Sequence, residues 1–233
     1  MNKASRQRLD KATAHLACCD PDWAILIDLV GPCQLALDRG REPFQALVHA
    51  VAHQQLNARA AQAIFKRFLA LYPDEPFPSP EMILATDDNV LRGCGFSLAK
   101  IASIRGIAEK TLQGVVPSRR MADVMRDQEL IARLTSLHGI GRWTVEMLLI
   151  FTLGRPDVLP VDDFGIREGW RLIKGLPRQP APKELAAIGQ PWAPYRSTAA
   201  WYLWRAVDQY KLAMASASPS PRPAGSKRNL SRR

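Results

Sequence analysis

The sequence lacks long apolar runs and the signals of an exported protein. Its 233 residues include no apolar stretch of the ~18 residues that a membrane-spanning helix needs. The N-terminus begins with charged residues and contains no apolar segment of signal-peptide length. We therefore expect no membrane partner and a cytoplasmic location. With 47% hydrophobic residues, the chain is long enough to bury a core.

Cysteine is also scarce, and its spacing argues against a metal centre. Cys18, Cys19, Cys33 and Cys94 form neither the paired C-x-x-C spacing of a zinc site nor the four-cysteine run of an iron–sulfur cluster. His53 and His138 have no metal-ligand partner at useful spacing. We expect small, reduced, mostly buried thiols and no iron–sulfur cluster.

Strand-like alternation of polar and apolar residues is absent except at residues 157–161. Helical patterns account for the rest, with starts marked by cap residues such as Asn57 and Ser97. An all-α fold without internal repeats is therefore predicted. The expected helices cover residues 5–18, 23–30, 44–54, 57–71, 81–85, 88–91, 98–113, 119–125, 128–137, an apolar segment after 141, a segment after 163, 182–188 and 195–214.

Acidic residues are missing from the C-terminal tail, which matters for the net charge. The chain carries a formal charge of +10, and five of its basic residues lie in the low-complexity stretch 215–233. We expect this basic tail to be disordered. A net positive charge favours binding to polyanions such as nucleic acid. The charge outside the tail is moderate, so basicity alone does not decide the function.

Two glycines, Gly139 and Gly141, flank Ile140 just before an apolar helix. Glycine permits a positive φ and lets another backbone come close. Unpaired N–H groups near the positive end of a helix form a ready phosphate site, to which Arg142 adds charge. From the glycines alone, a phosphate-binding hairpin and an ordinary joint between helices are equally supported.

Further motifs occur around this hairpin in a fixed order. They read H-Q-Q-L at 53–56, G-F-S-x-x-K at 95–100, L-x-G-I-G-R-x-T at 137–144, P-V-D-D at 160–163 and P-Y-R-S at 194–197. Together they resemble the helix-hairpin-helix DNA glycosylase superfamily (HhH-GPD), most closely its 3-methyladenine DNA glycosylase II branch. The resemblance covers roughly residues 44–210 and is far more specific than the hairpin alone.

The resemblance implies a two-lobed helix-hairpin-helix fold with its active site in the cleft between the lobes. Residues 1–214 would form the glycosylase domain. In it the N-terminal segment packs with the C-terminal helices as one lobe, and residues of about 45–165 carry the central helices and the hairpin. The implied function is excision of alkylated purines, such as 3-methyladenine and 7-methylguanine, from duplex DNA. Alternatives are another lesion, such as hypoxanthine or an etheno adduct, and a non-catalytic DNA-binding module.

The two carboxylates after Val161 are candidates for the chemistry. An aspartate before a helix is often only an N-cap. In the family this position carries the essential aspartate, and matching D-D-F-G-I-R to the methyladenine branch assigns it to Asp163. Matching V-D to the endonuclease III branch would select Asp162 instead, so Asp162 is the second choice.

An aromatic slot for the extruded base is also implied. The expected base pocket consists of Trp143, Met147, Phe164 and Trp204. Trp143 and Met147 share one helix face at i and i+4, and aromatic faces attract cationic bases. Core packing is the alternative for all four. In bifunctional relatives the position of Trp143 holds a Schiff-base lysine, so the resemblance implies a monofunctional enzyme that uses water.

The remaining expected site residues contact DNA. They are Gln55, Leu56, Lys100, Gly139, Gly141, Arg142 and Arg196. Leu56 would fill the gap left by the extruded base, or else belong to the core. Lys100 and Arg196 are either contacts to the DNA backbone or solvated charges.

No cofactor is expected for the chemistry itself, although the family's hairpin backbone is compatible with a structural monovalent cation. The implied partner is double-stranded DNA with alkylated bases, and the expected state is a monomer. In a bacterium the protein would be cytoplasmic and associated with the nucleoid; in a eukaryote it would be nuclear.

Overall fold

The computed structural model describes residues 3–217, and within this range all regular structure is helical. The predicted all-α class is confirmed, and residues 157–161 form no strand. The elements are α1 (Lys3–Cys19), α2 (Pro21–Val30), α3 (Pro43–His53), α4 (Ala58–Leu69), α5 (Pro80–Ala85), α6 (Asp88–Gly93), α7 (Leu98–Leu112), α8 (Arg119–Val124), α9 (Asp127–Leu134), α10 (Arg142–Met147), the π-helical η1 (Leu148–Thr152), α11 (Phe164–Ile173), α12 (Pro182–Ile188), the 3₁₀ turn η2 (Gln190–Trp192) and α13 (Arg196–Ala217).

The predicted tail boundary needs a correction. Residues 215–217 belong to α13, the last of the described helices, which ends at Ala217. The rest of the expected basic tail, 218–233, lies outside the described residues. Among the described helices, none is both long enough and apolar enough to cross a membrane.

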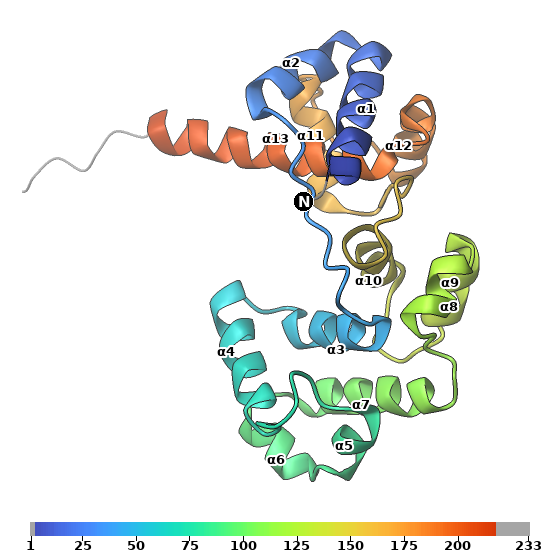
Figure 1. Cartoon of the computed structure of the whole chain (residues 1–233). Helices are drawn as coiled ribbons and strands as arrows, with labels where there is room; N and C mark the ends of the chain where they lie inside the picture. Colours follow the sequence, from blue (N-terminus) through green and yellow to red (C-terminus); the bar gives the residue numbers. More distant parts are fainter. Residues whose placement is uncertain (1–2, 218–233) are drawn as a thin grey trace, which may run out of the picture.

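The helices form two groups (Figure 1). In one group, α1 and α2 from the N-terminus pack on each other and on α13, which also lies along α11. In the other, α3 packs on α4 and α7, and α5 and α6 also contact α7. An extended linker, residues 31–42, leads from α2 to α3. The helix α10 lies between the groups and contacts α3 and α9.

Cap residues begin several of these helices where the sequence predicted them. The side chain of Asn57 accepts a hydrogen bond from the Ala60 N–H, and Ser97 accepts one from the Lys100 N–H. Such caps satisfy backbone donors that have no partner within the helix. The caps thereby fix the start of α4, directly after Gln55 and Leu56, and the start of α7, which carries Lys100.

The close crossing of α11 and α13 depends on a glycine. A Cβ at Gly169 would lie 2.2 Å from the carbonyl oxygen of Leu203, far inside contact distance. Glycine therefore lets the two helix backbones touch. This contact places Trp204, the next residue on α13, beside the first turn of α11.

The helix after the hairpin was predicted as a regular apolar helix, but its second half is a π-helical turn. The Leu153 N–H donates to the carbonyl of Leu148, five residues earlier, at 2.9 Å. Single π-turns are rare and occur often at functional sites. Here the turn carries Phe151, whose ring stacks on Trp204 with centroids 5.8 Å apart.

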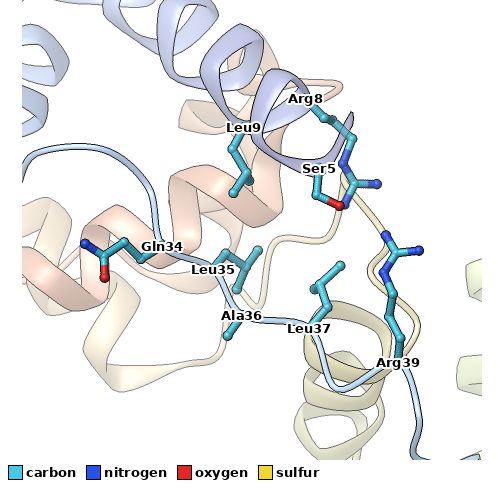
Figure 2. A pocket seen from close by; sticks show the side chains of 8 residues that line it. All are labelled: Ser5, Arg8, Leu9, Gln34, Leu35, Ala36, Leu37 and Arg39. Carbon is cyan, nitrogen blue, oxygen red and sulfur yellow. The ribbon is translucent and has the colours of Figure 1, made fainter. Parts of the chain in front are cut away.

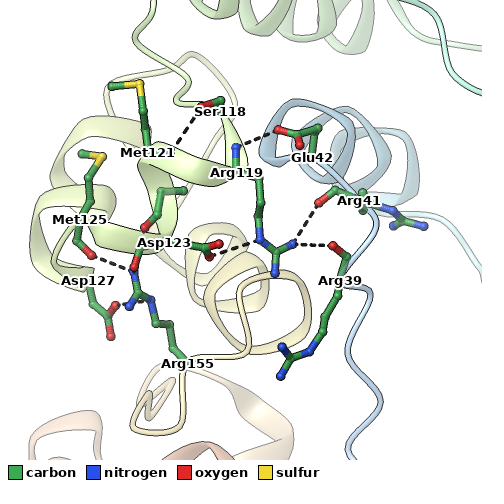
Figure 3. A network of polar contacts seen from close by, with 11 residues as sticks. Arg39, Arg41, Glu42, Ser118, Arg119, Met121, Asp123, Met125, Asp127 and Arg155 are labelled. Carbon is green, nitrogen blue, oxygen red and sulfur yellow. Dashed lines mark hydrogen bonds and ion pairs between the residues drawn. The ribbon is translucent and has the colours of Figure 1, made fainter. Parts of the chain in front are cut away.

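Arginines hold the short helices α8 and α9 in place (Figure 3). The Arg119 guanidinium donates to the carbonyls of Arg39 and Arg41 in the linker. Arg155 pairs with Asp127 at 3.1 Å and donates to backbone carbonyls at the end of α8. Guanidinium groups bound in this way are engaged inside the protein, so Arg119 and Arg155 are not free to contact a polyanion.

Candidate active site

The carboxylate of Asp163 caps the first turn of α11. Its Oδ1 accepts the backbone N–H of Ile166 at 2.8 Å. The expected capping role is therefore real, and it fixes the direction of the side chain. Asp162 is exposed, and its carboxylate takes part in no hydrogen bond or ion pair within residues 3–217.

Two tryptophans converge on the same carboxylate. The Trp143 Nε1–H donates to Oδ2 of Asp163 at 2.7 Å, and the Trp204 Nε1–H donates to Oδ1 at 3.0 Å. With the Ile166 N–H, both oxygens are held by N–H donors, all of which stabilise negative charge on the carboxylate. The sequence predicted both indoles as walls of a base slot but did not predict their hydrogen bonds to Asp163.

The aromatic surface beside Asp163 is open to solvent. Trp143 is 48% exposed and Phe164 is 67% exposed. Large exposed aromatic rings next to a fixed carboxylate suit the binding of a planar ligand. Met147, one turn after Trp143, is half-buried and packs against the core. Phe151, which stacks on Trp204, was not predicted, because within an apolar run it reads as an ordinary core residue.

The two hairpin glycines differ in what they do. Gly139 has φ +78, and a Cβ there would lie 2.4 Å from the Ser103 Oγ on α7. Gly141 has φ −88, caps α10 and would place a Cβ in open space. Gly139 is therefore required by the fold, whereas Gly141 leaves the backbone at the start of α10 accessible.

The loop between α3 and α4 carries an unusual backbone conformation. Gln55 has φ +55 and is the one non-glycine residue with positive φ among residues 3–217. This conformation costs about 1–2 kcal/mol for a residue with a Cβ. The next residue, Leu56, is 40% exposed, so it is not the core leucine of the alternative interpretation.

Lys100 and Arg196, both predicted as contacts to the DNA backbone, are occupied within the protein. The Lys100 ammonium donates to the carbonyls of Ala52 and Gln54, each at 2.9 Å. Arg196 makes a two-pronged pair with Asp157, at 2.7 and 2.8 Å. This pairing lowers the pKa of the Asp157 carboxyl. Both cations therefore have partners inside the protein, and their contacts with the DNA backbone stay predictions.

Arg142 keeps an exposed guanidinium at the hairpin. Its Nε donates to Oε1 of Glu146 one turn later at 2.9 Å, while half of the Arg142 side chain faces solvent. The Glu146 side chain is only 3% exposed, and burial raises the pKa of its carboxyl. The exposed part of the guanidinium remains free to meet an anion.

Residues 3–217 contain no cluster of three or more His, Cys, Asp or Glu side chains that would hold a metal ion. The hairpin offers neutral oxygens instead: the carbonyls of Leu137 and Gly139 each accept one hydrogen bond, from the Ile140 N–H and the Gln54 side chain. Each keeps a second lone pair, which fits a monovalent cation.

A separate cavity of about 420 Å³ lies between α1 and the linker (Figure 2). Its lining consists of Ser5, Arg8, Leu9, Gln34, Leu35, Ala36, Leu37 and Arg39. None of the predicted site residues belongs to it. The candidate active site is therefore the carboxylate and its indoles, and not this cavity.

A hairpin leading into one helix, and an aspartate capping the next, define the class of the protein. Residues 48–194 match the model of the HhH-GPD superfamily of base excision DNA repair proteins. The chain belongs to this superfamily. The predicted family, and with it a DNA N-glycosylase of base excision repair, are confirmed.

Individual relatives point to one branch of the superfamily. The chain is 45% identical to DNA-3-methyladenine glycosylase 1 of Schizosaccharomyces pombe, over 84% of this chain and 87% of the relative. A structure of the S. pombe 3-methyladenine DNA glycosylase Mag1 in complex with abasic DNA superposes with a TM-score of 0.76 at 45% identity, covering 84% and 95% of the two chains. A DNA-3-methyladenine glycosidase from Bacillus halodurans gives a TM-score of 0.78 at 33% identity, covering 86% and 91%.

Proposed function

We propose that the chain is a monofunctional glycosylase that releases alkylated purines, such as 3-methyladenine and 7-methylguanine, from double-stranded DNA. The observation that carries the proposal is the Asp163 carboxylate, held by three N–H donors between two indoles. The names of the relatives, DNA-3-methyladenine glycosylases, support the substrate class.

Asp163 is the proposed catalytic residue. Cleavage of the bond between C1′ and the base nitrogen develops positive charge on the sugar, and a fixed carboxylate stabilises that charge. The base leaves with the bonding electron pair, so an alkylated purine that is cationic in DNA departs as a neutral molecule. A water oxygen bonds to C1′, and Asp163 accepts or directs the water proton. The products are the free base and an abasic site.

Trp143, Met147, Phe164 and Trp204 are the proposed walls of the base slot. The exposed ring faces of Trp143 and Phe164 can stack on a flipped purine. An aromatic face attracts a cationic base by ~0.5–2 kcal/mol. Trp143 also occupies the position where the bifunctional relatives carry a lysine. No Schiff base can form there, which supports hydrolysis without strand cleavage.

The hairpin and the α3–α4 loop are the proposed DNA-binding elements. The open backbone at Gly141, with the Arg142 guanidinium, suits a phosphate at the start of α10. Exposed Leu56, with Gln55 beside it, would fill the space left by the flipped base. The carbonyls of Leu137 and Gly139 would hold a structural monovalent cation, whose charge would favour an anion at the hairpin, and the chemistry needs no other cofactor.

We further propose that the enzyme acts as a monomer on chromosomal DNA. This implies the nucleoid of a bacterial cytoplasm, or the nucleus of a eukaryotic cell. The fold itself presents one hairpin, one α3–α4 loop and one Asp163 in a single chain, so one copy is sufficient for one lesion.

The proposal is tested by incubating the enzyme with methylated duplex DNA and identifying the released bases by chromatography. Free 3-methyladenine and 7-methylguanine should appear, while the strand stays intact until alkali cleaves the abasic sites. Release of hypoxanthine or an etheno base alone from defined lesion duplexes would assign another substrate. DNA binding without release of any base would show that the protein is a non-catalytic DNA-binding module.

A further inference from the structure

The α3–α4 loop, residues 54–57, needs support from outside itself. Its backbone turns through Gln55 at φ +55, a conformation that a residue with a Cβ adopts at a cost. Leu56 is 40% exposed and is not part of the buried core, so the core does not anchor the loop through it. Such a conformation persists only where the surrounding structure imposes it.

The support on one side is Lys100. Its Nζ donates to the carbonyls of Ala52, in the last turn of α3, and of Gln54, the first residue of the loop, each at 2.9 Å. Carbonyls at the end of a helix have no partner within it, and a cation there is favoured by the helix dipole. Partial burial lowers the pKa of the Lys100 amine. One side chain therefore fixes the point at which α3 ends and the loop begins.

The support on the other side is the hairpin. The Gln54 Nε2–H donates to the carbonyl of Gly139 at 3.1 Å, across 85 residues of sequence. Gly139 in turn lies directly against Ser103, where a Cβ would approach the Ser103 Oγ to 2.4 Å. Ser103 is one turn after Lys100 on α7. The same helix therefore supports both the loop and the hairpin.

We infer that Lys100 is a positioning residue that sets the α3–α4 loop at a fixed distance and angle from the hairpin, with Gln54 as the link between them. The inference rests on the proposed function. The hairpin grips the DNA backbone while Leu56 enters the base stack, so their separation determines how far the duplex is bent when the base is flipped. The ammonium serves this purpose from inside the protein and does not contact a phosphate.

The test compares Lys100→Met with Lys110→Met, which removes the same charge near the other end of α7. Lys110 donates to Gln113 and lies away from the loop. Base flipping is measured by the fluorescence of 2-aminopurine placed next to the lesion, and chemistry by single-turnover base release at saturating enzyme. Affinity for undamaged duplex is measured as a function of salt.

Lys100→Met is expected to reduce both the fluorescence change and the single-turnover rate by about tenfold to a hundredfold, because a small misplacement of positioned groups has effects of this size. The affinity of Lys100→Met for undamaged duplex should depend on salt in the same way as that of Lys110→Met. Lys100→Arg, which keeps the charge and donors, should recover part of the loss. Melting temperatures show whether each variant is folded.

Gln54→Met is a second test, since it removes only a surface hydrogen bond to the hairpin. Like Lys100→Met, it should reduce the fluorescence change that reports base flipping. Lys100→Met could instead flip the base and release it at the normal rate at saturating enzyme, while the slope of log affinity against log salt becomes shallower by about one. That result would identify a phosphate contact and overturn the inference. If the wild type flips the base but releases none, the proposed function fails, and the flipping signal still tests the inference.

Discussion

The Trp143 indole and the Asp163 carboxylate are joined by a hydrogen bond of 2.7 Å across 20 residues of sequence. This bond ties the helix that follows the hairpin to the start of α11. The element that would hold the DNA backbone is thereby connected directly to the group that would face the sugar. Trp204 on α13 holds the other oxygen of the same carboxylate.

Trp143→Phe and Trp204→Phe should each slow base release while keeping an aromatic ring. A hydrogen bond to a charged group contributes about 1.5–3 kcal/mol, so single-turnover rates should fall about tenfold to a hundredfold. The matched control is Trp201→Phe, on α13 but without a bond to Asp163. Equal rates for all three variants would show that the indole N–H groups do not matter.

The two hairpin glycines should respond differently to alanine. Gly139→Ala combines φ +78 with a clash against Ser103, so we expect a loss of about 2 kcal/mol in the free energy of unfolding. Gly141→Ala meets no neighbour and should unfold like the wild type, but its methyl group would stand where a phosphate approaches. Urea unfolding and DNA-binding titrations separate the two effects. A stable Gly139→Ala variant would contradict the account.

Arg196 should prove structural. Arg196→Gln and Asp157→Asn should each lower the free energy of unfolding by about 1 kcal/mol, and the double variant should lose little more than either single one. The pKa of Asp157 is lowered in the folded state, so this stability is present at neutral pH and is lost as pH falls through the folded-state pKa, below the ordinary carboxyl range. A shallower salt dependence of DNA binding for Arg196→Gln would instead indicate a phosphate contact.

A chain that ends at Ala217 should bind undamaged DNA more weakly. It lacks the five basic residues that follow α13, so fewer counterions are released and the affinity should vary less steeply with salt. Base release at saturating enzyme should be unchanged, because Asp163 and its indoles are all retained. A large loss of the single-turnover rate would assign the tail a part in the chemistry.

The sequence predicted the helices well, because caps such as Asn57 and Ser97 act locally. The family motifs also led to the Asp163 site. The π-turn at Leu148–Thr152 could not be predicted, since its residues are as apolar as those of a regular buried helix. Its consequence, the stacking of Phe151 on Trp204, depends on a helix some fifty residues further along the chain.

The roles of Lys100 and Arg196 were beyond the sequence for a similar reason. A cation in a DNA-binding family is compatible with a phosphate contact, a solvated charge or an internal clamp. The internal partners are distant in sequence: the carbonyls of Ala52 and Gln54 are 48 and 46 residues from Lys100, and Asp157 is 39 residues from Arg196. Only the tertiary arrangement brings them together.

The most direct test of the central claim is single-turnover base release from a 3-methyladenine or 7-methylguanine duplex by wild type, Asp163→Asn and Asp162→Asn. Asp163→Asn should bind the duplex but release base at least about a hundredfold more slowly, because a neutral amide cannot stabilise the charge on the sugar. Asp162→Asn should remain close to wild type. A dead Asp162→Asn with an active Asp163→Asn would contradict the account.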